Sequence, residues 1–310
     1  MYFPTIQDLP AHAFDDYHEY RSITANPANQ LLFRVHRASG RGALVPGTGF
    51  VASNCPTPVD DPARGFYNYG TGRQWYRDQG LLISAARRHV AQWQDSTWDL
   101  PSSFLSASFS LPYALFEAHR WNRYHGCTDT LISIIDTTKI NSDAWLATQL
   151  IGSTQSRAAW FARSALEVIV YERIPESAIV ATAPVGAFLD GLPRWCEKAE
   201  IRSGIHASKG EVATSLGYSA RRNKTPEHEC ELVLHSVAQS IQMLRSRLPA
   251  SMADYDPITH ADAVDAIVRV ATMFVWWTQW ITWADPAAYP AYLQRVRAVV
   301  LQALAETSGT

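Results

Sequence analysis

The chain has 310 residues, 47% of them hydrophobic and 18% charged, which supports a folded core and excludes wholesale disorder. Its 27 basic residues nearly balance its 29 acidic ones, which argues against general binding to nucleic acid or to anionic membranes. The length suits two domains, since a single domain usually spans about 100–200 residues.

Targeting segments and metal motifs are not evident in the sequence. Residues 1–9 lack the basic and apolar regions of a secretory signal, so we expect no signal peptide. The sequence is compatible with a cytoplasmic location but does not determine the location. The uncharged apolar stretch 270–284 is shorter than the roughly 20 residues of a membrane span, which predicts a buried helix and no membrane span. The four cysteines are widely spaced, so we expect free thiols and no metal site.

The first half of the chain alternates between predicted strands and a helix. Residues 30–35 form a short apolar run that predicts a buried strand, followed by a glycine-rich loop. Apolar residues recur at helical spacing over 81–93 and predict a helix. Runs rich in β-branched or aromatic residues predict further strands over 103–109, 131–138, 166–171 and 178–181.

Beyond the proline and glycine cluster at 184–193, long helical patterns replace the strands. Pro226 suits the first turn of one such helix, and residues 270–283 should be largely buried against their neighbours. We therefore divide the chain into an N-terminal segment (1–29), an α+β domain (30–185) and an all-α domain (186–310).

Three separated segments contain the residue types of a candidate site. The first is a strand with Arg34, followed after a loop by Gly49-Phe50. The second is the run Ser106-Ala107-Ser108-Phe109, and the third is a strand that opens with Glu167 and ends before Ile174-Pro175. Each pattern alone occurs by chance in most chains, so the weight lies in their shared order and surroundings.

In that order the segments resemble the mono-ADP-ribosyltransferase superfamily, in its cholera-toxin and pierisin-like branch, which includes fungal proteins. The resemblance spans residues 31–180 and implies a pair of packed mixed β-sheets around an NAD cleft, with NAD as substrate and no metal. It implies that Glu167, Arg34 and Ser106 are catalytic and that Arg34, Ser106, Ser108 and Phe109 bind NAD. Ala107 departs from the pattern, because a threonine is usual there.

The chemistry suits these residue types. Breaking the bond between nicotinamide and ribose passes through an oxocarbenium-like cation, which a carboxylate such as Glu167 stabilises as charge develops. The planar guanidinium of Arg34 fits the diphosphate or adenosine side of NAD, and the hydroxyl of Ser106 orients Glu167 or the ribose. We therefore expect all three side chains to line one cavity.

The structural alternatives stay open at each position. Arg34 could belong to a structural ion pair, and Ser106 and Ser108 could be ordinary strand positions. Glu172 could replace Glu167 as the acid, although a turn position would expose it to solvent.

Ala165 bears on the reaction type, because many relatives carry Glu or Gln two positions before the catalytic glutamate to activate an acceptor. The leading function is transfer of ADP-ribose from NAD to an unknown acceptor, which could be a protein, a nucleic-acid base or a small molecule. The alternatives are an NAD glycohydrolase, with water as acceptor, and an inactive binding module. Trp160 and Phe161, in a predicted loop over 152–162, could contact the acceptor or nicotinamide, or simply pack.

Overall fold

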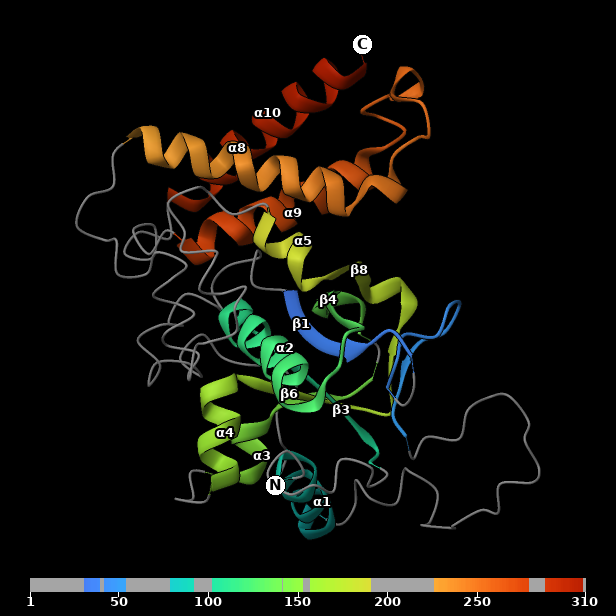
Figure 1. The fold of residues 1–310 in the computed structure, drawn as a ribbon, viewed down its shortest axis with the longest axis vertical. Coiled ribbons are helices and arrows are strands. Elements are labelled where there is room, and N and C mark those ends of the chain that lie inside the picture. The colour runs from blue at the N-terminus through green and yellow to red at the C-terminus, as the bar shows by residue number, and fades with distance from the viewer. Residues whose placement is uncertain are drawn as a thin grey trace.

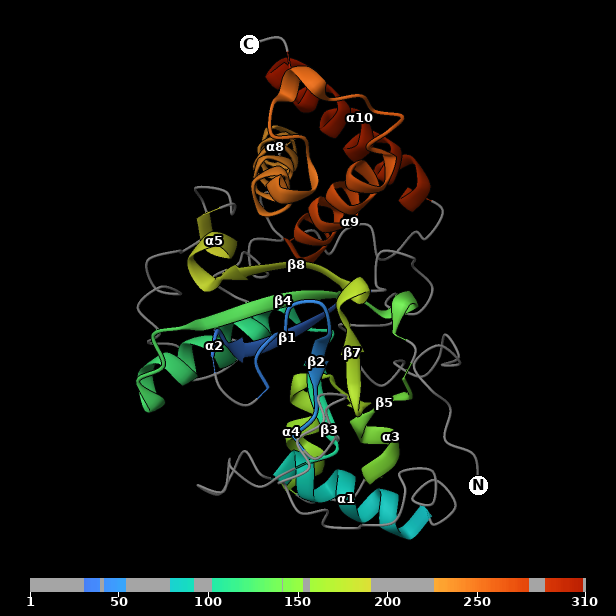
Figure 2. The ribbon, with the colours of Figure 1, turned by 90° about the vertical axis from the view of Figure 1, so that its right-hand side faces the viewer.

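The computed structural model describes residues 31–39, 42–53, 79–91, 102–140, 142–152, 157–190, 226–278 and 288–308. The expected N-terminal segment 1–29 lies outside these ranges. Along the long axis of the molecule, a group of helices lies at each end and the sheet lies between them (Figures 1 and 2).

The centre of the fold is a six-stranded sheet with the order β5-β6-β3-β1-β4-β8. Its strands are β1 (Leu31–Arg37), β3 (Phe104–Ser108), β4 (Thr130–Asp136), β5 (Ala144–Leu146), β6 (Glu167–Tyr171) and β8 (Ile179–Pro184). Two short strands, β2 (Gly49–Val51) and β7 (Arg173–Pro175), form a separate ladder. The α+β class is confirmed. The expectation of mixed sheets is wrong for the described strands, because all of their ladders are antiparallel.

The helices of the first half lie on one face and one end of this sheet (Figure 2). They are α1 (Gln79–Ala91), α2 (Leu111–His125), α3 (Ala147–Ile151) and α4 (Arg157–Ala165). Local signals fix the ends of α2: the Ser110 hydroxyl caps it by accepting from the Tyr113 amide, and Gly126 closes it with φ of 60°. The region 152–162 was expected to be a loop, but α4 begins within it at Arg157.

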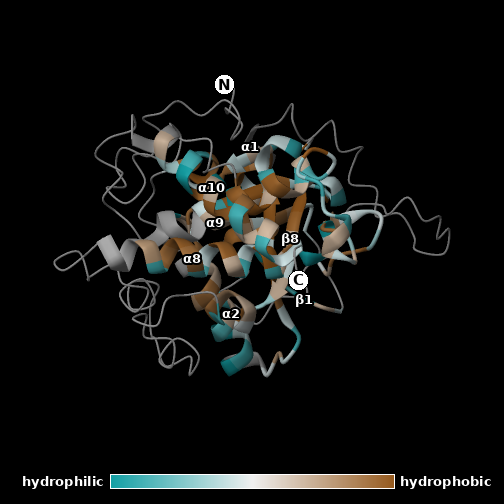
Figure 3. Ribbon diagram, turned by 90° about the horizontal axis from the view of Figure 1, so that it is seen from above, coloured by the Kyte–Doolittle hydropathy of each residue, from teal (hydrophilic) through white to brown (hydrophobic). Residues whose placement is uncertain are grey.

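Helices are the regular elements of the second half in its described residues. After α5 (Val185–Asp190) come α8 (Pro226–Met243), α9 (Ala261–Thr278) and α10 (Ala288–Ser308), with short 3-10 turns between α8 and α9. Pro226 opens α8 as expected. Seen from above, hydrophobic residues gather toward the centre of the molecule (Figure 3).

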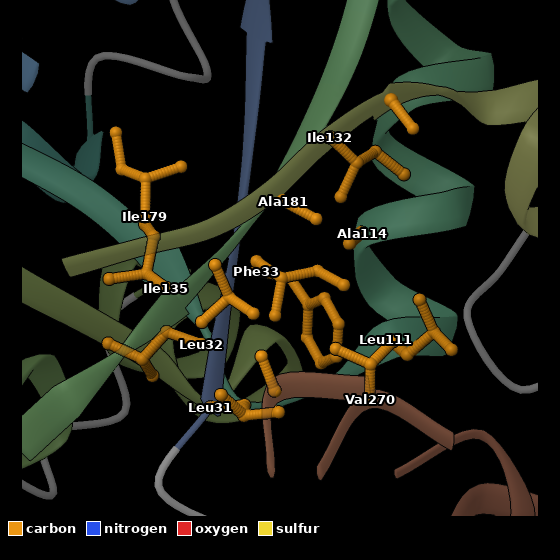
Figure 4. Close-up of a cluster of buried hydrophobic side chains, with 14 of the residues drawn as sticks. Leu31, Leu32, Phe33, Leu111, Ala114, Ile132, Ile135, Ile179, Ala181 and Val270 are labelled. Carbon is orange, nitrogen blue, oxygen red and sulfur yellow. The ribbon is translucent and has the colours of Figure 1, made fainter. Parts of the chain in front are cut away.

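One hydrophobic core joins the sheet to the C-terminal helices. Phe33 of β1 packs near Leu111 and Ala114 of α2, with Val270 of α9 beside them (Figure 4). Val270 is fully buried, as are Ala271 and Thr272, which confirms the start of the expected buried stretch 270–283. The side chains of the tryptophans that follow lie outside the described residues.

Polar contacts reinforce this junction. The Arg269 Nη1 atom of α9 lies 2.5 Å from Asp136 Oδ2 at the end of β4, and Arg247 donates to the carbonyl of Ile179 at 2.7 Å. Asp136 is 1% exposed, so its charge is neutralised inside the interface. The boundary expected at residue 185, between the α+β part and the helical part, therefore lies next to a surface along which these two parts pack against each other.

Candidate active site

A cavity opens where two neighbouring strands of the sheet part. β1 pairs with β4 through seven registered residue pairs but meets β3 only at Phe33 and Ser108. Beyond that pair the strands diverge, and a cavity of about 870 Å³ lies between them. This volume is within the range of roughly 300–1,000 Å³ that is common for small-molecule sites.

Glu167 enters the cavity at the first position of β6, after a strained residue. Leu166 has φ of 47°, a conformation that non-glycine residues rarely adopt. Hydrogen bonds hold the backbone on both sides of this strain, because Ser108 Oγ donates to the Ala165 carbonyl and the Phe109 amide donates to the Leu166 carbonyl. Since Glu167 is registered opposite Ser108, its side chain points to the same face of the sheet as Ser106.

A directed chain of hydrogen bonds ends on the Glu167 carboxylate. Ser106 Oγ donates to Glu167 Oε1 at 2.6 Å, and His89 Nε2 lies 2.8 Å from the same hydroxyl. Because a serine has a single hydroxyl proton, His89 Nε2 must then be the donor to Ser106. Its Nδ1 accepts from Ser102 Oγ at 2.7 Å. Each group in the chain is therefore oriented by the one before it.

Burial sets the charges of this chain. It raises the pKa of Glu167 from 4.5 to about 7; the Ser106 hydrogen bond opposes this rise and the charge of Glu117 adds to it. Burial, with a smaller contribution from the charge of Arg34, lowers the pKa of His89 to about 3. At neutral pH the histidine is neutral, and the carboxyl group is poised between its two protonation states.

Arg34 reaches across the gap from β1. Its Nη1 donates to the Ser106 carbonyl at 2.6 Å, and its guanidinium carbon lies 4.9 Å from the ring centre of Phe50, in cation–π contact. Nε is buried and has no hydrogen-bond partner among the described residues, and no described carboxylate pairs with the guanidinium. Burial lowers the pKa of Arg34 to about 10, so it remains charged at neutral pH. A half-buried, charged arginine in a cavity suits an anionic ligand.

The position of Phe50 depends on a glycine. Gly49 has φ of 98° and pairs with Pro175 of β7, where a Cβ atom would lie 2.1 Å from the Ile174 carbonyl oxygen. Only glycine fits this approach without a backbone shift. The sequence Gly49-Phe50 thus lets β2 place the ring over Arg34.

All of this geometry lies within one family domain. Residues 27–188 match a family described as "Domain of unknown function (DUF7587)". The chain belongs to this family. The match covers just over half of the chain and includes every residue that lines the cavity, from Phe33 to Glu167, whereas α8, α9 and α10 lie beyond it. A comparison with curated proteins finds no match.

The DUF7587 domain brings together most of the predicted site residues. Arg34, Ser106, Ser108 and Glu167 all line the cavity, which confirms the geometric expectation and leaves their roles as proposals. The Ser108 hydroxyl contacts backbone, donating to Ala165 and accepting from the Ser110 amide.

Other predicted positions lie elsewhere. Phe109 belongs to the hydrophobic core and does not line the cavity, because it follows the last residue of β3 and packs inward. Trp160 and Phe161 lie on helix α4 rather than in a loop, and neither lines the cavity. Glu172 is partly exposed at the turn between β6 and β7, also outside the cavity.

Several polar residues of the DUF7587 cavity were not predicted from the sequence, among them His89 and Glu117. His89 lies three and seven residues after Ala86 and Leu82, so it shares the buried face of α1, and a polar residue on an apolar face was the available signal. Glu117 lies on α2, and no spacing relates it to Glu167, because only tertiary packing brings the two elements together.

Metal and membrane features are also absent from the described residues. These residues contain no group of three or more His, Cys, Asp or Glu placed to hold a metal ion. Over the same ranges, no helix combines the length and apolar character of a membrane span. Of the four cysteines, Cys127 is buried and Cys230 is exposed, while Cys55 and Cys196 lie outside the described ranges.

Proposed function

We propose that this DUF7587 protein is a mono-ADP-ribosyltransferase that cleaves the nicotinamide–ribose bond of NAD in the cavity between β1 and β3. The observation that carries the proposal is that Arg34, Ser106 and Glu167 share the cavity, with Ser106 bonded to Glu167 at 2.6 Å. These three residues are the ones whose sequence motifs resemble the cholera-toxin and pierisin-like transferases.

The electrostatics of the cavity support binding before cleavage. NAD carries a diphosphate, and Arg34 is a charged guanidinium with no described carboxylate partner. NAD also carries a positively charged nicotinamide ring. When this ring approaches Glu167, it favours the ionised carboxylate and so lowers the pKa of Glu167 from its raised value. The ligand would therefore create the charge that its own cleavage needs.

In the chemical step the bond between ribose C1′ and the nicotinamide nitrogen breaks, and its electron pair goes to the nitrogen. Positive charge then develops on the ribose, and the ionised Glu167, held by Ser106, stabilises it. An acceptor oxygen or nitrogen forms the new bond to C1′ and loses its proton. Glu167 is more effective here than in water, because it is 6% exposed.

One observation favours NAD hydrolysis as a second candidate. Ala165 is 2% exposed at the end of α4, does not line the cavity and contributes only its carbonyl to the network. The usual acceptor-activating side chain is thus missing at that position, which leaves water as the simplest nucleophile.

The two functions separate in one experiment. The purified full chain is incubated with NAD labelled in the adenosine part, with and without a cell lysate, and both nicotinamide release and label transfer are followed. Transfer of label to a lysate component supports the transferase, whereas lysate-independent release of nicotinamide and free ADP-ribose supports the hydrolase. Absence of nicotinamide release in both arms would rule out both functions.

A further inference from the structure

Helix α2 presents three polar or aromatic side chains to the cavity. Tyr113, Glu117 and Trp121 recur at four-residue spacing, so they form one stripe along the helix, and all three line the cavity. The stripe adds a second carboxylate, from an element different from that of Glu167.

The Glu117 carboxylate is held in a defined orientation. It is 4% exposed and accepts a forked pair of bonds from Arg120, with Nε at 2.8 Å from Oε2 and Nη2 at 2.7 Å from Oε1. The indole nitrogen of Trp121 donates to Oε1 at 2.7 Å. A carboxylate offers about four acceptor positions, so Oε2 retains the capacity to accept one more bond.

Glu117 and Glu167 line the same cavity, and their charges interact there. After burial, which is the larger cause, the charge of Glu117 raises the pKa of Glu167. Burial and then the charges of Glu117 and Glu167 raise the pKa of Tyr113 well above its usual value. Tyr113 therefore lies within the electrostatic reach of both carboxylates.

We propose that Glu117 receives the attacking nucleophile, the role that Ala165 leaves open. The inference rests on the proposed cleavage of NAD and specifies the class of acceptor, a group with an O–H or N–H to donate, with water as the simplest member. As the water oxygen forms its bond to ribose C1′, Glu117 accepts one of the water protons, and the departing electron pair goes to nicotinamide. Glu167 stabilises the ribosyl cation, and Glu117 acts on the nucleophile.

The test compares nucleophiles that do and do not need a base. Glu117→Gln should slow the hydrolytic release of nicotinamide by about 100-fold, the lower end of what a general base contributes. The azide anion, added as its sodium salt, attacks without losing a proton. Adding it should therefore restore nicotinamide release and yield ADP-ribosyl azide. Azide should not rescue Glu167→Gln, because the missing charge there acts on the cation.

Two controls separate this role from a structural one. Glu172→Gln makes the same chemical change outside the cavity and should behave as wild type. Glu117→Gln combined with Arg120→Gln removes both charges of the ion pair and so leaves the local net charge unchanged. NAD affinity and thermal melting are measured for every variant.

The outcomes are distinct. Loss of hydrolysis with azide rescue, in either Glu117 variant, supports the proposal. An unchanged rate of hydrolysis in Glu117→Gln overturns the proposal. A loss of hydrolysis that azide fails to restore also overturns it and would assign Glu117 a structural role in α2. A wild-type chain that binds NAD without cleaving it would overturn the proposed function itself, and this inference with it.

Discussion

The two sides of strand β1 differ in how they are held. Toward β4 the strand is paired along its whole length, and the facing residues Ile132, Ile134 and Ile135 are fully buried. Toward β3 it is paired at one position, and a side-chain bond from Arg34 to the Ser106 carbonyl replaces the ladder. Where two strands of a sheet are not hydrogen-bonded along their length and ionisable groups are buried between them, a functional role explains the arrangement better than a structural one.

Buried charges differ in the same way between these two regions. Although burial raises the pKa of Asp136 at the end of β4, the hydrogen bond and charge of Arg269 and the bonds from Thr138 lower it overall. Glu167, beside the gap, has no cationic partner among its described contacts, and its pKa rises to about 7. The charge of Asp136 is balanced by Arg269 within the fold, whereas Glu167 can change its protonation state near neutral pH.

The largest expected effect is on the paired side. Arg269→Met leaves the Asp136 carboxylate buried without its counter-charge and should lower the free energy of unfolding by about 3–4 kcal/mol. NAD affinity of the folded fraction should be unchanged. Urea unfolding and calorimetric titration check this, and a large loss of affinity would mean that the two sides of β1 are coupled.

The second prediction concerns stability against pH. Glu167 has a raised pKa when folded, so below about 4.5 it is neutral in both states and adds no penalty. As the pH rises toward about 7, the unfolded state ionises first and the native state loses stability. Glu167→Gln removes this loss, so its stability relative to wild type should increase between pH 5 and pH 8 by up to about 3 kcal/mol. A difference that stays flat over this range, in urea unfolding at each pH, would show that Glu167 ionises normally.

The third prediction addresses the binding role of Arg34. Arg34→Ala removes a guanidinium that would contact NAD in both the ground state and the transition state, so KM should rise by about 30-fold, roughly 2 kcal/mol, with little change in kcat. Steady-state kinetics of nicotinamide release measure both. A fall in kcat at unchanged KM would move Arg34 to the chemical step.

The smallest effect is expected at His89, which orients Ser106 without reaching Glu167. His89→Leu should lower kcat by about tenfold, roughly 1.4 kcal/mol, because Ser106 loses its donor and its hydroxyl is free to rotate away from the carboxylate. His89→Gln retains an N–H donor and should recover part of the rate. Equal losses in both variants would indicate a packing role for the ring.

Sequence patterns predicted β1, β3, β4, β6 and β8 and the acidic residue that opens β6, because buried strands and short motifs are local properties. They did not predict the three-residue strands β2, β5 and β7, which are too short to show a periodic pattern. They could not predict the gap beside Arg34, since strand register is set by the whole sheet. Helix α4 was foreseeable from the alanines of its Ala-Ala-Trp-Phe-Ala run, which favour helix over loop. Glu117 was not, because it is 50 residues from Glu167 in sequence and they meet only when α2 packs on the sheet.

The central claim is that Glu167 stabilises the ribosyl cation of NAD in the gap beside β1. Glu167→Gln keeps the size and hydrogen bonding of the side chain but removes its charge, so NAD affinity should be largely retained while kcat falls by about 100- to 1,000-fold. The measurement is nicotinamide release at saturating NAD, compared with Glu172→Gln, which should retain wild-type turnover. Full activity of Glu167→Gln together with an inactive Glu172→Gln would contradict the account.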